Sequence, residues 1–217
     1  YCLQWPSLAD FYSGAGWLSR DFLLQNKDFW TQSIFFYWDG PGFLTAFHAL
    51  FLAACLALAF GCFTSLAKWL VLIGHISYLY RNPMVGYGAD NLLAAFLWPL
   101  CLAPIGSAWS VDAWQKKKKP LVSSWAFACR RLIQIQMAVL FLFSGIEKLR
   151  GDSWWSGDAL WIVFTNYEYL DQIPLLWFAH HYALLNLLVY FTLAIEISYP
   201  FLIWHRKSRP WILAPAI

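Results

Sequence analysis

Charged side chains are scarce in this chain. Lysine, arginine, aspartate and glutamate make up 12% of the 217 residues and hydrophobic residues 60%, against about 25% and about 45–50% in soluble globular domains. The sequence has no C-x-x-C pair, no His-x-x-x-His or Glu-x-x-His spacing, and no phosphate-binding glycine loop followed by Lys-Ser or Lys-Thr. These absences leave a metal site or a nucleotide site without a motif. They favour small buried hydrophobes for four of the five cysteines.

The hydrophobic residues gather in runs long enough to cross a bilayer, for which a helix needs about 20 largely apolar residues. Aromatic residues make up 20% of the chain, with 15 tryptophans, and such side chains anchor the ends of membrane helices. We therefore predict an all-α fold, a polytopic transmembrane helix bundle with interfacial helices, in a single domain over residues 1–217. The first and last residues show neither a signal peptide nor a complete final span, so we expect a segment of a longer protein.

The runs divide the chain into five expected spans. They cover about 41–64, 66–81, 91–109, 121–150 and 182–204, and we expect residues 1–40 and 151–181 to lie at the membrane interface. Pro99 and Pro104 fall inside the third span, where neighbouring helices can satisfy the freed carbonyls, so we expect a kink rather than a break.

Basic residues gather on one side of the membrane if these spans alternate. They are Lys68, Lys116 to Lys119, Arg130, Arg131, Arg206, Lys207 and Arg209. The positive-inside rule makes that side cytoplasmic and predicts a multi-pass cell-membrane protein. We interpret the lysine tetrad as a solvated loop near anionic lipid rather than a nucleic-acid site. Arg81, Asp90 and Lys148 then share the opposite side.

Ionisable residues inside spans are functional candidates because each costs about 2.5–3.5 kcal/mol to insert. His48 and His75 fit either hydrogen-bonded packing residues or members of a site. Glu196 lies about 12 Å along the helix from Trp204 at 1.5 Å per residue. Near mid-membrane it must be protonated or paired, and both structural pairing and proton handling remain open.

Lys148 has two interpretations. As a lysine just inside the boundary it can extend its ammonium to water. If it points into a water-poor cavity, burial favours a neutral amine that can take a proton. Helical spacing places Ser144 one turn below Lys148 and turns Glu147 about 100° away. A carboxylate close to Lys148 would hold it charged, so its partner decides between the two.

Five segments occur in an order typical of one family. They are "DFYSGAGWLSR", "RNPMVGYGADNLL", "GSAWSVDAW", "RRLIQIQMAVLFLFSGIEKLRGDSWWSGDALW" and "EISYPFLIW". With this order and spacing the chain resembles the HTTM-domain proteins, bacterial and animal membrane proteins similar to vitamin K-dependent gamma-carboxylase. The resemblance covers nearly the whole chain.

The resemblance implies a carboxylase, or carbon–carbon lyase, that uses reduced vitamin K or menaquinol with O2 and CO2 and acts on a protein or peptide glutamate. In it, Lys148 of "GIEKL" matches the lysine base that deprotonates the quinol. The stretch "YGADNLL" stands where the animal enzyme has a histidine.

We expect six further residues to bind the quinol or substrate. They are Asp90, Asn91, Arg81, Glu196, His48 and His75. Two alternatives to an enzyme remain open. One is a transporter or channel that uses Glu196, Lys148 and Asp90 along its path, and the other is a non-catalytic membrane scaffold.

Overall fold

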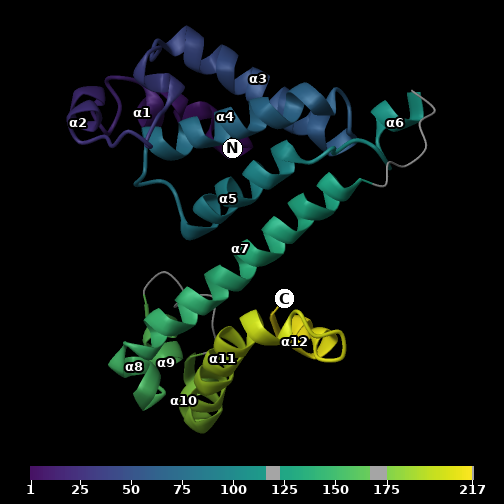
Figure 1. The fold of residues 1–217 in the computed structure, drawn as a ribbon. Helices are drawn as coiled ribbons and strands as arrows, with labels where there is room; N and C mark the ends of the chain where they lie inside the picture. The colour runs from purple at the N-terminus through teal and green to yellow at the C-terminus, as the bar shows by residue number, and fades with distance from the viewer. Residues whose placement is uncertain (116–122, 167–174, 217) are drawn as a thin grey trace. The chain divides into compact units, whose positions relative to one another are not determined.

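The computed structural model describes residues 1–115, 123–166 and 175–216, and every regular element in them is a helix (Figure 1). The predicted all-α class is confirmed. The lysine tetrad at 116–119 lies outside the described residues. The chain forms two compact units, residues 1–133 and 134–217, which we describe separately.

Among the described residues up to 115, the first unit holds three long helices that follow one another as neighbours. They are α3 (Pro41–Phe60), α4 (Thr64–Arg81) and α5 (Gly88–Leu102), and α4 packs against both of the others (Figure 1). Short elements precede and follow them: η1 (Cys2–Ser7), α1 (Leu8–Tyr12), α2 (Arg20–Gln25), η2 (Ile34–Phe36) and α6 (Val111–Gln115). The expected interfacial segment 1–40 thus contains short helices.

Aromatic side chains form the core of this unit. Phe35 of η2 is fully buried and its ring lies 5.0 Å from that of Tyr78 in α4. Gly74 allows α3 and α4 to come together, because a Cβ there would lie 2.2 Å from the ring of Phe51. Part of the 1–40 segment is therefore packed into the helix hairpin rather than resting loosely on it.

The third long helix is shorter than the sequence suggested. We expected a span over 91–109, kinked at both prolines, but α5 ends at Leu102 with Ala103 in an extended conformation. The residue before a proline is driven out of the helical region, so Pro104 ends the helix. Pro99 lies inside α5, where the helix continues past it.

Within the described ranges, three helices are long and apolar enough to cross a membrane: α3, α7 (Ser124–Leu149) and α11 (Tyr182–Leu202). The apolar helix α5 has only 15 residues, and α4 carries Lys68, His75 and Arg81, so neither reaches the same standard by length and composition. Side chains such as Leu56, Phe60 and Phe143 are more than half exposed, which suits helices that face lipid.

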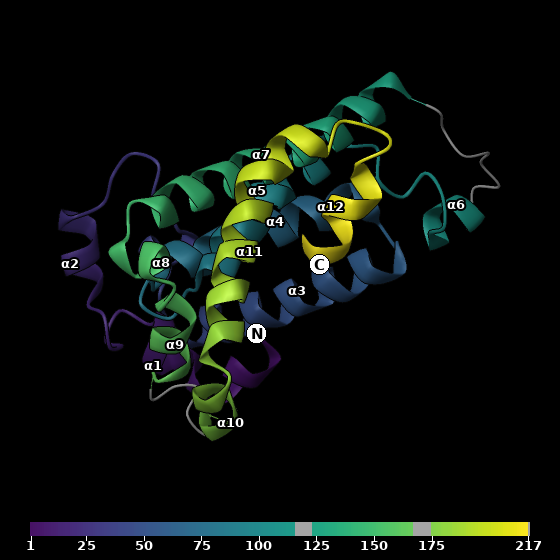
Figure 2. The same cartoon turned by 90° about the horizontal axis from the view of Figure 1, so that it is seen from below.

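The second unit contains most of α7 and the remaining helices. They are α8 (Asp152–Ser156), α9 (Ala159–Phe164), α10 (Leu175–His180), α11 and α12 (Arg209–Ala216). In Figures 1 and 2, α8, α9 and α10 gather near the start of α11. Tyr199, Ile203 and Ile212 form the buried hydrophobic cluster of the second unit, and Phe141 of α7 packs against it.

In the first unit, α4 begins with a cap supplied from another helix. Phe63 has a left-handed backbone with φ 47°, and the carboxylate of Asp112 in α6 accepts hydrogen bonds from the backbone N–H groups of Phe63 and Thr64 at 3.0 and 2.8 Å. It also accepts from the Thr64 hydroxyl at 2.8 Å. Asp112 thus satisfies free donors at the helix start and adds a favourable negative charge there.

We expect Asp112→Ala to lower the free energy of unfolding by about 1 kcal/mol, the usual cost of a lost N-cap. That corresponds to a fall of about 2–4 °C in Tm for a chain of this size. Thermal unfolding of the purified protein in detergent measures it. Asp21→Ala, which removes an exposed aspartate in α2, is the matched control; equal Tm values for the two variants would contradict the capping role.

Candidate functional site

The ammonium of Lys148 meets the carboxylate of Glu196 inside the second unit. Lys148 Nζ donates to both carboxylate oxygens at 2.8 Å and to Ser144 Oγ at 2.6 Å. The ring centroid of Trp154 lies 5.3 Å from the same nitrogen, within the range of a cation–π contact. α7 supplies Lys148 and Ser144, α11 supplies Glu196 and α8 supplies Trp154.

Gly145 allows α7 and α11 to approach each other closely beside the Lys148–Glu196 ion pair. A Cβ on Gly145 would lie 2.7 Å from Ile197 Cδ1 and 3.3 Å from Glu196 Cβ. Small residues serve this purpose at membrane helix contacts. Farther along, Phe141 stacks on Tyr199 with ring centroids 4.2 Å apart, so the helices run antiparallel through the contact.

Glu147, the other carboxylate that could have paired with Lys148, has a different partner. Its Oε1 accepts from Arg150 Nη1 at 2.7 Å, and the two side chains are 65% and 70% exposed. The side chains of Lys148 and Glu196 are only 24% and 14% exposed. The ion pair of Lys148 is therefore the more shielded of the two, and it is formed between helices rather than along one.

The pair lies well inside α11. At 1.5 Å per residue, Glu196 is about 21 Å from the start of this helix at Tyr182 and about 9 Å from its end. The first half of α11 is covered by the segment after Lys148: the Tyr190 hydroxyl donates to the carbonyl of Trp155 at 2.7 Å, and Tyr182 donates to Asp158. Lys148, in the last turn of α7, therefore lies beside the final third of α11, and the first half of α11 runs beside α8 and α9.

Asp158 ties this covering segment together. It accepts hydrogen bonds from the hydroxyls of Tyr182 and, at 2.7 Å, Ser156. These two hydrogen bonds, with that of Tyr182 the stronger, hold the pKa of Asp158 below its usual value. The carboxylate thus stays charged at neutral pH and keeps α8 and α9 bound to the start of α11.

The first unit brings two of the other predicted residues together. His75 is buried, and its Nε2 lies 2.8 Å from the backbone carbonyl of Asp90, while its Nδ1 lies 2.8 Å from the Tyr1 hydroxyl. A carbonyl can only accept, so Nε2 carries a proton and donates it to the carbonyl of Asp90. The Asp90 carboxylate accepts from the Tyr87 backbone N–H at 2.8 Å and caps α5.

The remaining candidates have separate surroundings. His48 is buried with Nδ1 2.9 Å from the Tyr78 hydroxyl. Arg81 is fully buried and donates to the backbone carbonyls of Leu18, at 3.0 Å, and Ser13, so it holds the N-terminal segment against the end of α4. Asn91 is exposed in the first turn of α5.

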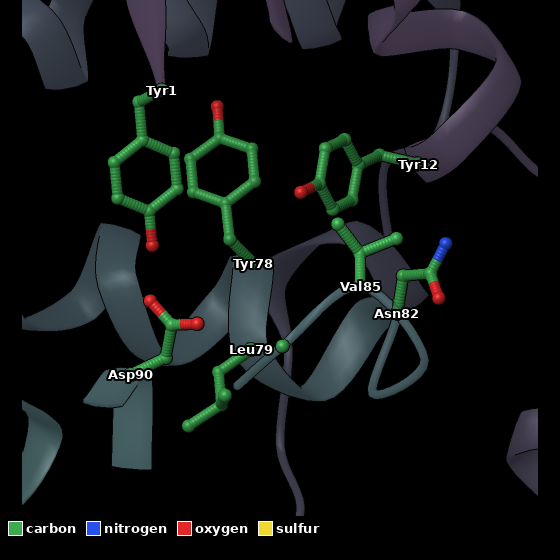
Figure 3. Close-up of a pocket in the computed structure, with 8 residues that line it drawn as sticks. Tyr1, Tyr12, Tyr78, Leu79, Asn82, Val85 and Asp90 are labelled. Atoms are coloured by element: carbon green, nitrogen blue, oxygen red, sulfur yellow. The ribbon is translucent and has the colours of Figure 1, made fainter. Parts of the chain in front are cut away.

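Sequence analysis missed a small polar cavity beside Asp90. It has a volume of about 90 Å³ and is lined by Tyr1, Tyr12, Tyr78, Leu79, Asn82, Val85, Gly86 and Asp90. Figure 3 shows the Tyr1 hydroxyl pointing toward the Asp90 carboxylate. An apolar cavity that accepts benzene measures about 150 Å³, so this space is too small for a quinol ring. The sequence signal for it was the four-residue spacing of Tyr78 and Asn82, at the end of α4 and at its C-cap.

Among the described residues, no group of three or more His, Cys, Asp and Glu side chains is arranged to hold a metal ion. An interhelical ion pair and three long apolar helices are features of a helical integral membrane protein. The sequence model of the HTTM domain family matches residues 13–217. The chain therefore belongs to the HTTM-domain family, as its five ordered segments indicated. No curated protein and no solved structure matches it.

The two ion pairs near the end of α7 should differ in strength. We expect a coupling energy of about 2 kcal/mol between Lys148 and Glu196 in a double-mutant cycle with Lys148→Met and Glu196→Gln, since either single change leaves one charge of a shielded pair without its counter-charge. The same cycle with Glu147→Gln and Arg150→Met should give less than about 0.5 kcal/mol, because exposed pairs contribute little.

Unfolding of the variants in detergent measures both couplings. The Glu147 cycle is the matched control, since it lies in the same turn of the same helix. Equal couplings, or a larger one for the exposed pair, would contradict the assignment of Glu196 as the partner of Lys148.

Proposed function

We propose that this HTTM-domain protein uses Lys148 to take a proton from the hydroxyl group of a lipophilic quinol. The placement of Lys148 is the observation that carries the proposal. Ser144 and Glu196 hold its side-chain nitrogen at the contact between α7 and α11. A structural lysine that only anchors a helix end would extend to water, whereas this one turns toward a neighbouring helix.

The residues around Lys148 suit a flat, uncharged substrate. Lys148 and Glu196 cancel each other's charge, so the site presents no net charge to a ligand that arrives from lipid. Trp154 offers an aromatic ring beside the reactive nitrogen, against which another ring can pack. Ser144 holds the amine and can donate its own hydroxyl hydrogen to a substrate oxygen.

The substrate class follows from the family resemblance. Reduced vitamin K or a bacterial menaquinol, with O2 and CO2, would supply a strong base for carboxylation of a carbon acid such as a peptide glutamate. The protein's own residues bind the quinol, orient one hydroxyl toward Lys148 and limit access of water to the nitrogen.

Lys148→Ala is expected to lower the rate of quinol oxidation about 10²- to 10⁴-fold, the usual contribution of a positioned base. Lys148→Arg tests the role of the base while a positive charge is kept. An arginine can pair with Glu196 but does not release its proton, so this variant should also be slow. The assay contains purified protein, menaquinol or reduced vitamin K, O2, labelled CO2 and a glutamate peptide.

Glu147→Gln is the matched control for this assay and should keep the wild-type rate, because Glu147 pairs with Arg150. No quinol oxidation by the wild type, or oxidation at the wild-type rate by both Lys148 variants, would rule out the catalytic role. Ion flux into liposomes that needs Glu196 but no quinol would favour the transport alternative.

We also propose that the basic loops are cytoplasmic, which places the α10 end of the second unit outside. In a variant without native cysteines, Gln115→Cys at the end of α6 and Leu176→Cys in α10 provide exposed reporters. An impermeant thiol reagent added to intact cells should label only position 176. Labelling of position 115 alone would reverse the orientation.

A further inference from the structure

We infer that Glu196 is the proton acceptor for Lys148, so that the pair, rather than the lysine alone, is the base. The inference rests on the proposed function and answers a question that the geometry raises. An amine bound to a carboxylate at 2.8 Å is held as an ammonium at rest. Lys148 can take a substrate proton only after it has given up one of its own.

The geometry provides a direct route for that proton. Both oxygens of Glu196 lie 2.8 Å from Lys148 Nζ, so a hydrogen of the ammonium already points at the carboxylate. The third contact, with Ser144 Oγ, fixes the nitrogen from its own helix. Ser144 is a positioning residue, because a neutral serine hydroxyl does not keep an additional proton.

Each proton that leaves one group is taken up by another, and the net charge of the site and substrate stays at zero. The Lys148 ammonium first passes a proton to Glu196, which leaves a neutral amine beside a neutral carboxylic acid. The amine then takes the proton of the substrate hydroxyl: its O–H bond breaks, an N–H bond forms, and the electron pair stays on oxygen. The new ammonium faces the substrate oxyanion, while Glu196 holds the first proton.

Every state in this sequence has zero net charge, which is the advantage of the pair in a poorly solvated site. A lone lysine would begin as an unpaired cation, which is costly to place within a membrane. The charged groups near in sequence do not disturb the exchange, because Glu147 and Arg150 pair with each other and are largely exposed. On α11, the side chain that follows Glu196 by one turn is the uncharged Tyr199, stacked on Phe141.

Glu196→Gln is the central variant, because its amide can still accept a hydrogen bond from Lys148 but cannot take its proton. We expect kcat for menaquinol oxidation to fall about 10²-fold or more while KM stays near the wild-type value. The rate of this variant should rise with pH, since bulk water must then remove the lysine proton. Glu196→Asp, which keeps a carboxylate, should recover part of the rate.

Infrared difference spectroscopy provides a readout that does not depend on turnover. Addition of menaquinol without oxygen should produce a protonated-carboxyl band in the wild type that is missing in Glu196→Gln. Menaquinone, which has no hydroxyl proton to give, should produce none. Circular dichroism and binding of menaquinone check that the variants are folded.

The outcomes separate the two proposals. Lys148-dependent oxidation without the carboxyl band, or a Glu196→Gln variant with wild-type kcat and pH profile, overturns the role of Glu196 and leaves the proposed function intact. A carboxyl band without Lys148-dependent oxidation supports proton transfer within the pair and overturns the proposed reaction. Absence of both overturns both.

Discussion

A lysine and a glutamate at the contact of two apolar helices are stabilised when each neutralises the charge of the other. The contact of Lys148 with Glu196 meets this condition across α7 and α11, and the surrounding arrangement follows from it. Gly145 removes the side chain that would hold the helices apart, Ser144 saturates the ammonium, and α8 turns back to place Trp154 beside it. The site and the packing of the second unit therefore depend on the same few atoms.

In the first unit, buried polar side chains also join separate elements of the fold. The buried guanidinium of Arg81 binds two backbone carbonyls of the N-terminal segment, and the imidazole of His75 links α4 to the start of α5. These hydrogen bonds set where the segment and the helices dock. Arg81 therefore has a positional role, whereas the role that we propose for Lys148 requires its nitrogen to exchange protons.

The helices and their order could be predicted from the sequence, because apolar runs are local signals. Lys148 was singled out by the cost of charge in lipid, and its role as a base stays a prediction. Glu196 was also recognised as needing a partner. Its pairing with Lys148 was not predictable, since it joins residues 48 positions apart. Glu147 was the nearer carboxylate, but helix geometry turns it to Arg150. The third span was predicted too long because we expected Pro104 to kink the helix. Instead, Ala103 before this proline is extended and α5 ends at Leu102.

The central claim is that Lys148 and Glu196 form one ion pair within the bilayer. Solid-state NMR of the protein in lipid, with ¹⁵N in lysine side chains and ¹³C in glutamate carboxyls, measures it directly. We predict a strong dipolar coupling between Lys148 Nζ and the Glu196 carboxyl carbon, as an N–O distance of 2.8 Å requires. The coupling should persist in Glu147→Gln. Loss of the coupling in that variant, or its absence from the wild type, would contradict the account.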